Sequence, residues 1–253
     1  MAEENLRGKI ALVTGAAVRL GRQIALALAD EGVNIILHYR NSGDEAEELR
    51  RLLEARSVSV WLIRADFDKT TESESLIRRS LDAAGSLHYL INCASIFPAD
   101  RIETLSFASL QQCIRVNAWA PFVLCREFHR RIGQGKIVNL LDTRIADFDW
   151  HHVSYILSKQ MLAHWTRILA IEFAPDTTVN GVAPGLILPP RGNDASYLER
   201  LKTSLPLQRH GDAEDISSAV LFLLRSRFIT GEIIHVDGGR HLKEYSHGQN
   251  HHP

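Results

Sequence analysis

The stretch Thr14-Gly15-Ala16-Ala17-Val18-Arg19-Leu20-Gly21 joins an apolar run at Lys9–Thr14 to a segment with helical spacing at Leu20–Glu31. Small residues at such a junction allow the backbone to approach a diphosphate, and the first turn of the helix offers N–H donors to it. The spacing differs from G-x-G-x-x-G, because only the second and last residues of the stretch are glycine and Arg19 lies between them. A strand–helix turn that binds no ligand would share these residues, but the position after the first strand favours a nucleotide site.

Apolar, strand-like runs alternate with helical segments along the chain. The predicted strands are Lys9–Thr14, Val33–His38, Val58–Arg64, His88–Asn92, Lys136–Leu141, Thr178–Val182 and Glu232–Val236. The predicted helices are Leu20–Glu31, Gly43–Ala55, Thr71–Ala84, Ser106–Val116 with a continuation to Arg130, His152–Ala174 and Asp212–Leu224. This alternation predicts an α/β protein, with a parallel seven-stranded sheet and helices on both faces in a single doubly wound Rossmann domain.

The composition is that of an ordinary globular domain. The chain has 253 residues, of which 45% are hydrophobic and 23% charged, and its net charge is −1. This balance favours neither nucleic acid nor an anionic membrane as a partner, and no apolar run reaches the ~20 residues of a membrane span. The three cysteines are odd in number and lack metal-ligand spacing, which indicates reduced thiols. We therefore expect a cytoplasmic protein without a bound metal.

We expect residues 1–242 to form one domain and residues 243–253 to form a flexible tail. The one long irregular stretch is Pro184–Leu205, which is rich in proline and glycine. A loop of that length in a compact α/β domain usually lies over a site. We therefore place the substrate loop at about residues 186–205.

The residues after the second strand select the dinucleotide. Folds that bind NAD usually carry Asp or Glu there, which holds the ribose hydroxyls. This chain instead reads His38-Tyr39-Arg40-Asn41-Ser42, without an acid. Arg40, with Ser42 and Arg19 nearby, could give charge-assisted hydrogen bonds to a 2′-phosphate, so the predicted cofactor is NADP(H). Asp66, after the third strand, could accept a hydrogen bond from the adenine amino group or cap the next turn.

Tyr155 and Lys159 stand four residues apart in a predicted helix, and Asp142 precedes the tyrosine by thirteen residues. Residues four apart share one face of a helix. A fixed ammonium favours phenolate, so we expect Lys159 to lower the pKa of Tyr155 from its usual value near ~10. A tyrosine tuned in this way is a general acid. Because Tyr-x-x-x-Lys alone is common by chance, its meaning depends on the residues around it.

The motifs, taken in order, resemble those of the short-chain dehydrogenase/reductase family over nearly the whole chain. They are Thr14-Gly15 … Gly21, Asp66, Asn92-Cys93-Ala94-Ser95, Asn117, Tyr155 with Lys159, Pro184-Gly185 and Asp237-Gly238-Gly239. The resemblance implies catalysis by Asp142, Tyr155, Lys159 and Asn117, where Asn117 orients a water that links Lys159 to solvent. With the turn and Arg40, it implies cofactor contacts from Gly15, Arg19, Leu20, Gly21, Tyr39, Arg40, Asn41, Ser42, Asp66, Asn92, Ala94, Tyr155, Lys159, Pro184, Gly185 and Leu186. Cys93 departs from the family, which usually has a second asparagine there.

Most members of the family carry serine where this chain has Asp142. Aspartate at this position resembles the pteridine reductases and the bacterial dihydromonapterin reductases, and Arg19, Ser95 and Phe97 agree with that subgroup. The resemblance implies NADPH-dependent reduction of a pterin C=N bond, in dihydromonapterin, a dihydropteridine or dihydrofolate. Asp142 and Tyr155 would share the proton that reaches the ring nitrogen. The implied substrate contacts are Arg19, Ser95, Phe97, Asp142 and Tyr155, with the ring of Phe97 stacked on the pterin.

Two alternatives stay open from the sequence. One is another short-chain carbonyl reductase, such as a 3-oxoacyl-thioester reductase that tolerates Asp142. The other is a non-catalytic NADP-binding regulator on the same fold, against which the intact Asn117, Tyr155 and Lys159 argue. The resemblance also implies a homotetramer, paired through the helices predicted at Ser106–Arg130 and His152–Ala174.

Overall fold

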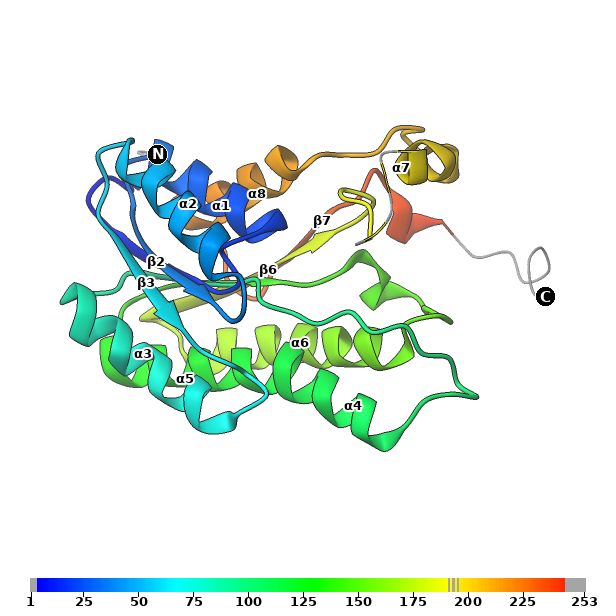
Figure 1. Ribbon diagram of the computed structural model, residues 1–253, viewed down its shortest axis with the longest axis horizontal. Coiled ribbons are helices and arrows are strands. Elements are labelled where there is room, and N and C mark those ends of the chain that lie inside the picture. Colours follow the sequence, from blue (N-terminus) through cyan, green and yellow to red (C-terminus); the bar gives the residue numbers. More distant parts are fainter. Residues whose placement is uncertain (1–3, 191, 193, 195, 244–253) are drawn as a thin grey trace.

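Seven parallel strands form one sheet in the computed structural model, which describes residues 4–190, 192, 194 and 196–243 (Figure 1). The strands are β1 (Ile10–Val13), β2 (Asn34–Tyr39), β3 (Val60–Arg64), β4 (Tyr89–Asn92), β5 (Gly135–Leu140), β6 (Thr177–Pro184) and β7 (Ile233–Val236). Their order across the sheet is β3-β2-β1-β4-β5-β6-β7. The chain reverses its direction of progress between β1 and β4, and doubly wound sheets bind ligands beyond the carboxyl ends of their strands at such a point.

Helices cover both faces of the sheet (Figure 1). On one face lie α1 (Arg19–Asp30), α2 (Gly43–Glu54) and α8 (Ala213–Arg225), and on the other lie α3 (Thr70–Ala84), α5 (Ala120–Ile132) and α6 (Val153–Glu172). A shorter helix, α4 (Phe107–Ile114), leads into α5 and packs against α6. The Rossmann fold predicted from the alternation of strands and helices is confirmed.

The strands bury apolar side chains on both faces because helices cover both sides. In β1, Ala11 and Val13 belong to the same buried cluster as Leu28 of α1. Leu12 points to the opposite face, since successive side chains alternate along a strand, and it shares a cluster with Phe128 of α5. These two layers of core fix where each strand ends and therefore where the loops of the site begin.

Two segments differ from the sequence-based expectation. The helix expected from Ser106 to Arg130 is interrupted by a π-helical turn at Arg115–Trp119, between α4 and α5. The stretch expected to be irregular contains a short helix, α7 (Ser196–Leu201), followed by a 3₁₀ turn at Lys202–Ser204. This helix forms because Leu198 is buried in a small apolar cluster with Leu186 and Leu205.

The expected tail over residues 243–253 lies outside the described residues except for Lys243. No helix within the described part of the chain is long and apolar enough to cross a membrane.

Candidate active site

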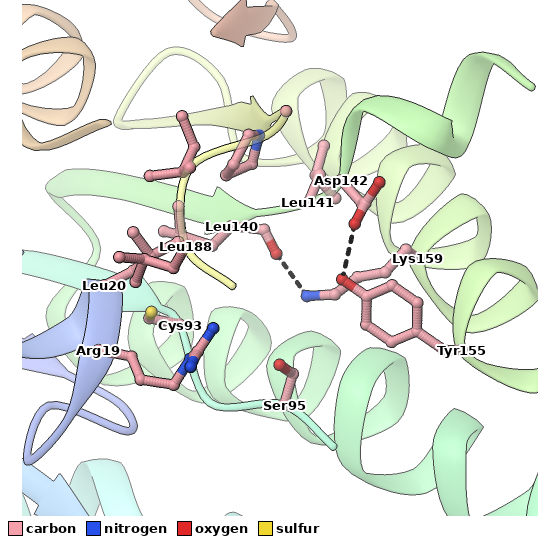
Figure 2. A pocket seen from close by; sticks show the side chains of 13 residues that line it. Arg19, Leu20, Cys93, Ser95, Leu140, Leu141, Asp142, Tyr155, Lys159 and Leu188 are labelled. Atoms are coloured by element: carbon pink, nitrogen blue, oxygen red, sulfur yellow. Dashed lines mark hydrogen bonds between the residues drawn. The ribbon is translucent and has the colours of Figure 1, made fainter. Parts of the chain in front are cut away.

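A cavity of about 150 Å³ lies at the carboxyl ends of β4, β5 and β6, between the first turn of α1 and the first turns of α6 (Figure 2). It brings together predicted cofactor, substrate and catalytic residues from parts of the chain that are far apart in sequence. The lining residues are Arg19, Leu20, Cys93, Ser95, Leu140, Leu141, Asp142, Tyr155, Lys159, Pro184, Gly185, Ile187 and Leu188.

Asp142 and Tyr155 are in direct contact. The phenol Oη of Tyr155 donates to Oδ2 of Asp142 at 3.1 Å (Figure 2). The other carboxylate oxygen, Oδ1, accepts the backbone N–H of Arg144 at 2.9 Å, as the cap of a 3₁₀ turn at Thr143–Ala146. One oxygen of Asp142 is thus held by the backbone that follows β5, and this contact aims the other oxygen at the phenol.

Lys159 lies one helical turn beyond Tyr155 on the same face of α6. Its Nζ donates to the carbonyl oxygen of Leu140 at 2.6 Å and lies 5.8 Å from the centroid of the Tyr155 ring. Burial lowers the pKa of Lys159 to about 8. The thiol of Cys93 also lines the cavity, and burial raises its pKa to about 11, so the thiol stays protonated near the lysine.

The expectation that Lys159 lowers the pKa of Tyr155 is wrong for this structure. Burial raises the pKa of Tyr155 well above its usual value, and the negative charge of Asp142 adds to the increase. Both effects disfavour phenolate, and a lysine whose ammonium points at the Leu140 carbonyl does not overcome them. Tyr155 is therefore a protonated phenol at neutral pH.

A buried carboxylate fixes the start of α6, on which Tyr155 lies. Asp100, in the loop after β4, accepts the backbone N–H of Ser154 at 3.0 Å and the hydroxyl of Ser109 at 3.0 Å. The Ser154 hydroxyl also donates to this carboxylate. Burial by itself would raise the pKa of Asp100, but the hydrogen bonds from Ser154 and Ser109 outweigh it and lower the pKa. These hydrogen bonds therefore tie the loop after β4 to the start of α6.

Asn117 lies in the π-helical turn between α4 and α5. Its Oδ1 accepts the N–H of Ile96 at 2.8 Å, and its Nδ2 donates to the carbonyl of Ile96 and to Oγ of Ser158, each at 3.0 Å. π-Helical turns inside helices occur often at functional sites. Here the side-chain amide of Asn117 links the loop after β4 to α6. Its partner in α6 is Ser158, which immediately precedes Lys159.

Phe97 stands at the open side of the site. It is 45% exposed, its ring meets Tyr155 edge-on at 4.6 Å between centroids, and His152 stacks on it at 3.9 Å and 12°. Nδ1 of His152 lies 3.2 Å from Oδ2 of the buried Asp149. Ser95, two residues before Phe97, lines the cavity itself. Four of the five predicted substrate residues thus line the cavity, and Phe97 lies next to it against Tyr155. His152, which contacts Asp149, packs on one face of Phe97.

The turn after β1 is closely packed at both of its glycines. A Cβ on Gly15, whose φ is +66°, would lie 2.9 Å from Cα of Ala94. A Cβ on Gly21 would lie 2.3 Å from the Gly15 carbonyl oxygen, so the first turn of α1 packs directly on the loop. Val18 precedes the helix and gives it no side-chain cap. In any α-helix the first N–H groups point away from the helix and can receive an anion.

Arg19 adopts a left-handed backbone conformation, with φ of +56°, that residues other than glycine rarely adopt. Its Nη2 donates to the carbonyl of Pro189 at 2.8 Å, which links the turn after β1 to the loop after β6. Its side chain lines the cavity (Figure 2).

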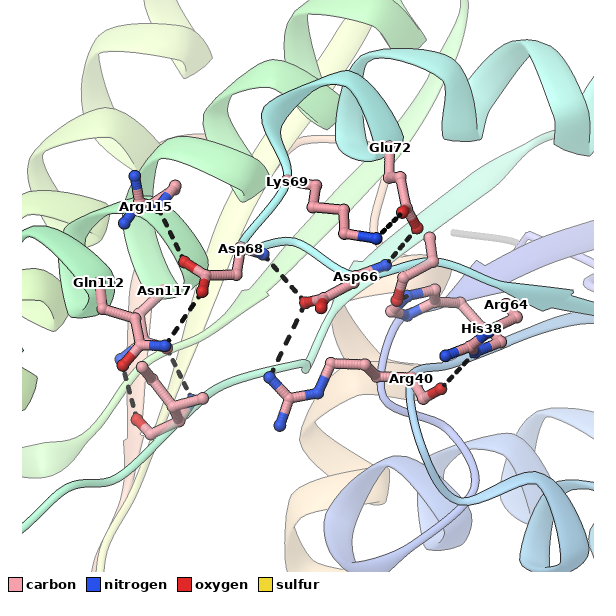
Figure 3. Close-up of polar contacts among 12 residues, drawn as sticks. His38, Arg40, Arg64, Asp66, Asp68, Lys69, Glu72, Gln112, Arg115 and Asn117 are labelled. Carbon is pink, nitrogen blue, oxygen red and sulfur yellow. Dashed lines mark hydrogen bonds and ion pairs between the residues drawn. The ribbon is translucent and has the colours of Figure 1, made fainter.

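The ends of β2 and β3 carry the predicted adenosine end of the cofactor site (Figure 3). Nη1 of Arg40 lies 3.8 Å from Oδ1 of Asp66, and the same oxygen accepts the N–H of Asp68 at 3.1 Å. Asp68 in turn pairs with Arg115 at 2.9 Å, at the beginning of the π-helical turn. The half-exposed guanidinium of Arg40 thus lies beyond the carboxyl end of β2, beside Asp66.

The other predicted cofactor residues lie at the ends of several strands and in different environments. Asn41 is exposed, and Ser42 precedes α2 without capping it. Pro184 and Gly185 line the cavity, whereas Leu186 is buried in the cluster beneath the substrate loop. The side chain of Asn92 points into the core, where it donates to Asn139 at 2.8 Å. This hydrogen bond joins β4 to β5. The predicted contact of Asn92 with the cofactor would therefore have to come from its backbone.

Several residues of the site were not predicted from the sequence. Leu141, Ile187 and the Leu140 carbonyl form its floor. They carry no chemical signal, because they are apolar residues at strand ends. His152 had a signal, since it stands three residues before Tyr155 and so one helical turn away, but its contact with Phe97 depends on a loop that is remote in sequence.

Comparison with known proteins decides the family. The family model described as "Enoyl-(Acyl carrier protein) reductase" matches residues 15–241. The chain belongs to the short-chain dehydrogenase/reductase family. It is an oxidoreductase of this family, and the resemblance drawn from its motifs is confirmed at that level.

Relatives within the family differ in their reactions. The chain is 31% identical over 242 residues to the 3-oxoacyl-[acyl-carrier-protein] reductase FabG of Staphylococcus epidermidis, covering 92% of this chain and 99% of that protein. Among solved structures it resembles FolM Alternative dihydrofolate reductase 1 from Brucella suis in complex with NADP, at 30% identity and a TM-score of 0.89 over 94% of this chain and 97% of that one. The FolM protein of Brucella canis, complexed with NADP, gives 30% identity and a TM-score of 0.88, with 96% and 98% coverage. The ligand of these two neighbours agrees with the predicted NADP(H).

Proposed function

We propose that this short-chain dehydrogenase/reductase uses NADPH to reduce a C=N bond of a reduced pterin, in dihydromonapterin, another dihydropteridine or dihydrofolate. The cofactor is NADP(H). The close packing at Gly15 and Gly21 suits a diphosphate, and we assign the 2′-phosphate to Arg40, at the end of β2. The FolM proteins of Brucella, named as alternative dihydrofolate reductases, support the choice of substrate class.

The observation that carries the proposal is the hydrogen bond between Tyr155 and Asp142. Reduction of a ketone builds negative charge on oxygen, and a carboxylate at that place would repel it. A pterin instead presents ring N–H and amino groups, from which a carboxylate can accept hydrogen bonds. Asp142 therefore suits a nitrogen heterocycle better than a ketone.

Bound NADPH supplies the hydride for the ring carbon. The proton for the ring nitrogen comes from the Tyr155–Asp142 pair, whose oxygens are 3.1 Å apart. In this contact the Tyr155 hydroxyl is the proton donor and the Asp142 carboxylate is the acceptor. Positioned proton transfer of this kind contributes ~10²–10⁴ in rate. Lys159 keeps a positive charge beside the pair near neutral pH, because its pKa is lowered only to about 8.

Phe97 offers a flat apolar surface for the heterocycle. Stacking of aromatic rings contributes ~0.5–1.5 kcal/mol beyond the burial of area. Because His152 already covers one face of Phe97, the other face is the one left for the pterin. Ser95 and Arg19 line the cavity beside Tyr155 and would add polar contacts to the heterocycle.

A second candidate is reduction of a 3-oxoacyl thioester, which the identity to FabG favours. NADPH oxidation by the purified protein separates the two. Dihydrobiopterin, dihydromonapterin and dihydrofolate would be compared with acetoacetyl-coenzyme A by kcat/KM under the same conditions. We expect turnover of at least one dihydropterin at a higher kcat/KM than the thioester. Turnover of the thioester without any dihydropterin would replace the proposal by the second candidate.

We also propose that the protein is a homotetramer. The support is an exposed apolar stripe on α6, formed by Leu157, Met161, Ile168 and Ile171 at helical spacing, with Ile171 81% exposed. Light scattering after size exclusion measures the mass directly. Replacement of Ile168 by Glu should then reduce that mass, and a wild-type monomer would contradict the proposal.

A further inference from the structure

His38, at the end of β2, is buried with 2% of its surface exposed. Its Nδ1 lies 3.1 Å from the backbone nitrogen of Gly15, whose N–H donates to it. On the other side of the ring, Nε2 lies 3.0 Å from the carbonyl oxygen of Ala65, after β3. A carbonyl only accepts, so Nε2 carries the proton and Nδ1 is the acceptor. The imidazole therefore bridges the ends of β1 and β3 in a single tautomer.

The ring is held rigidly in this bridge. Phe67 stacks on it at 4.4 Å between centroids and 6° between planes, and the carbonyl of His38 accepts the N–H of Ala16 at 3.0 Å. On the opposite side of the turn, Oγ1 of Thr14 accepts the N–H groups of Cys93 and Ala94 at 2.9 and 3.0 Å. The turn is thus fixed from β2 on one side and from β4 on the other.

The contact matters because Gly15 is closely packed within the turn. Its left-handed φ of +66° and its closeness to Ala94 leave it little room to move. Without an acceptor on His38, the partly buried Gly15 N–H would have to rotate to find another partner, since an unsatisfied donor shielded from water is costly. That rotation would also move the first turn of α1, because Gly21 packs on the Gly15 carbonyl.

We propose that His38 is a positioning residue for the cofactor, which holds the Gly15 turn in the shape that receives the diphosphate by accepting its N–H. His38 acts through the backbone and does not itself touch NADPH. The inference concerns the diphosphate and holds whichever substrate is reduced.

Two substitutions separate the acceptor from the rest of the ring. In His38→Asn the amide oxygen takes the place of Nδ1 and can still accept from Gly15. In His38→Gln the amide reaches the place of Nε2, so the contact with Ala65 can persist while the acceptor for Gly15 is lost. Both variants lose the stacking on Phe67, which makes them a matched pair for stability.

Dissociation constants for NADPH and NADH would be measured by fluorescence titration, with thermal unfolding of each variant alongside. We expect His38→Gln to raise both constants by about tenfold or more, since an unsatisfied buried donor costs that much, and His38→Asn to change them by less than about threefold. NADPH and NADH should shift by the same factor because both contain the diphosphate. Arg40→Gln should weaken NADPH alone.

Equal dissociation constants of the two His38 variants for NADPH would overturn the proposal. A lower melting temperature of His38→Gln with unchanged cofactor binding would overturn it as well. A shift for NADPH alone would assign His38 to the 2′-phosphate and overturn it too. If His38→Gln does not fold, ¹⁵N NMR of histidine-labelled wild-type protein tests the same contact. The proposal requires the Nε2–H tautomer for His38, and an Nδ1–H signal would contradict it.

Discussion

Oη of Tyr155 donates a hydrogen bond to Oδ2 of Asp142 across 3.1 Å, and the other oxygen of that carboxylate is held by the backbone of Arg144. This contact, with burial as the larger cause, raises the pKa of Tyr155. Removing the negative charge should therefore lower the pKa of this tyrosine. In Asp142→Asn, one tyrosine should ionise at lower pH than in the wild type, as followed by the ultraviolet absorbance of tyrosinate. The double variant with Tyr155→Phe should not show this step. An unchanged titration curve in Asp142→Asn would mean that the carboxylate does not act on the phenol.

His152 should affect substrate binding through Phe97. Because its ring stacks on Phe97 at 3.9 Å, His152→Ala should let Phe97 turn away from the pterin. The loss of one stacking contact is worth ~0.5–1.5 kcal/mol, which corresponds to a roughly two- to tenfold higher KM for the dihydropterin. His152→Phe keeps an aromatic ring in that place and is the matched control, with a KM near that of the wild type. A fall in kcat alone for His152→Ala would show that the histidine acts on the chemical step instead.

Arg40 should determine the preference for NADPH over NADH. Hydrogen bonds to charged groups contribute ~1.5–3 kcal/mol, so Arg40→Gln should weaken NADPH roughly 10- to 150-fold and leave NADH almost unchanged. Arg78→Gln is a suitable control, because Arg78 pairs with Asp82 on the exposed surface of α3. Calorimetric titration with both cofactors gives the ratio. An equal loss for NADPH and NADH would show that Arg40 does not meet the 2′-phosphate.

Acid should destabilise the protein partly through His38. Burial is the main cause that lowers its pKa from 6.5 to about 4, with Arg79 adding to the decrease and Glu72 and Asp66 opposing it. A histidine with a lowered folded pKa stabilises the fold fully above about 6.5, and this contribution is lost as the pH falls toward 4. The loss is on the order of 3 kcal/mol.

The free energy of unfolding in urea, measured between pH 7 and pH 4, tests this pH dependence. His38→Asn has no imidazole to protonate, so the difference in unfolding free energy between wild type and variant should narrow as the pH falls. A difference that stays constant over that range would mean that His38 does not remain neutral in the fold.

Much of the fold followed from local patterns. Apolar runs of four to eight residues separated by helical periods predicted the strands and the helices, because each element buries a face set by its own period. The four-residue spacing of Tyr155 and Lys159 placed both on one face of α6. The position of Asp142 just after β5 brought it to the carboxyl end of the sheet, where the contact with the phenol forms.

What the sequence did not predict depends on contacts between distant segments. The sign of the pKa shift of Tyr155 follows from its burial under loops that come together only in the fold. The bond between Gly15 and His38 spans 23 positions in the chain and needs β1 and β2 to pair in register. The π-helical turn lies where Asn117 hydrogen-bonds both the loop after β4 and α6. Local periodicity carries no information on any of these.

The central claim is that the Asp142 carboxylate, paired with Tyr155, adapts the site to a pterin. The most direct measurement is kcat for Asp142→Ser with saturating NADPH, with a dihydropterin and with acetoacetyl-coenzyme A. Serine restores the residue that most of the family carries. The account predicts a loss of ~10²–10⁴ in kcat for the dihydropterin, with thioester turnover kept or increased. Undiminished reduction of the dihydropterin by Asp142→Ser would contradict it.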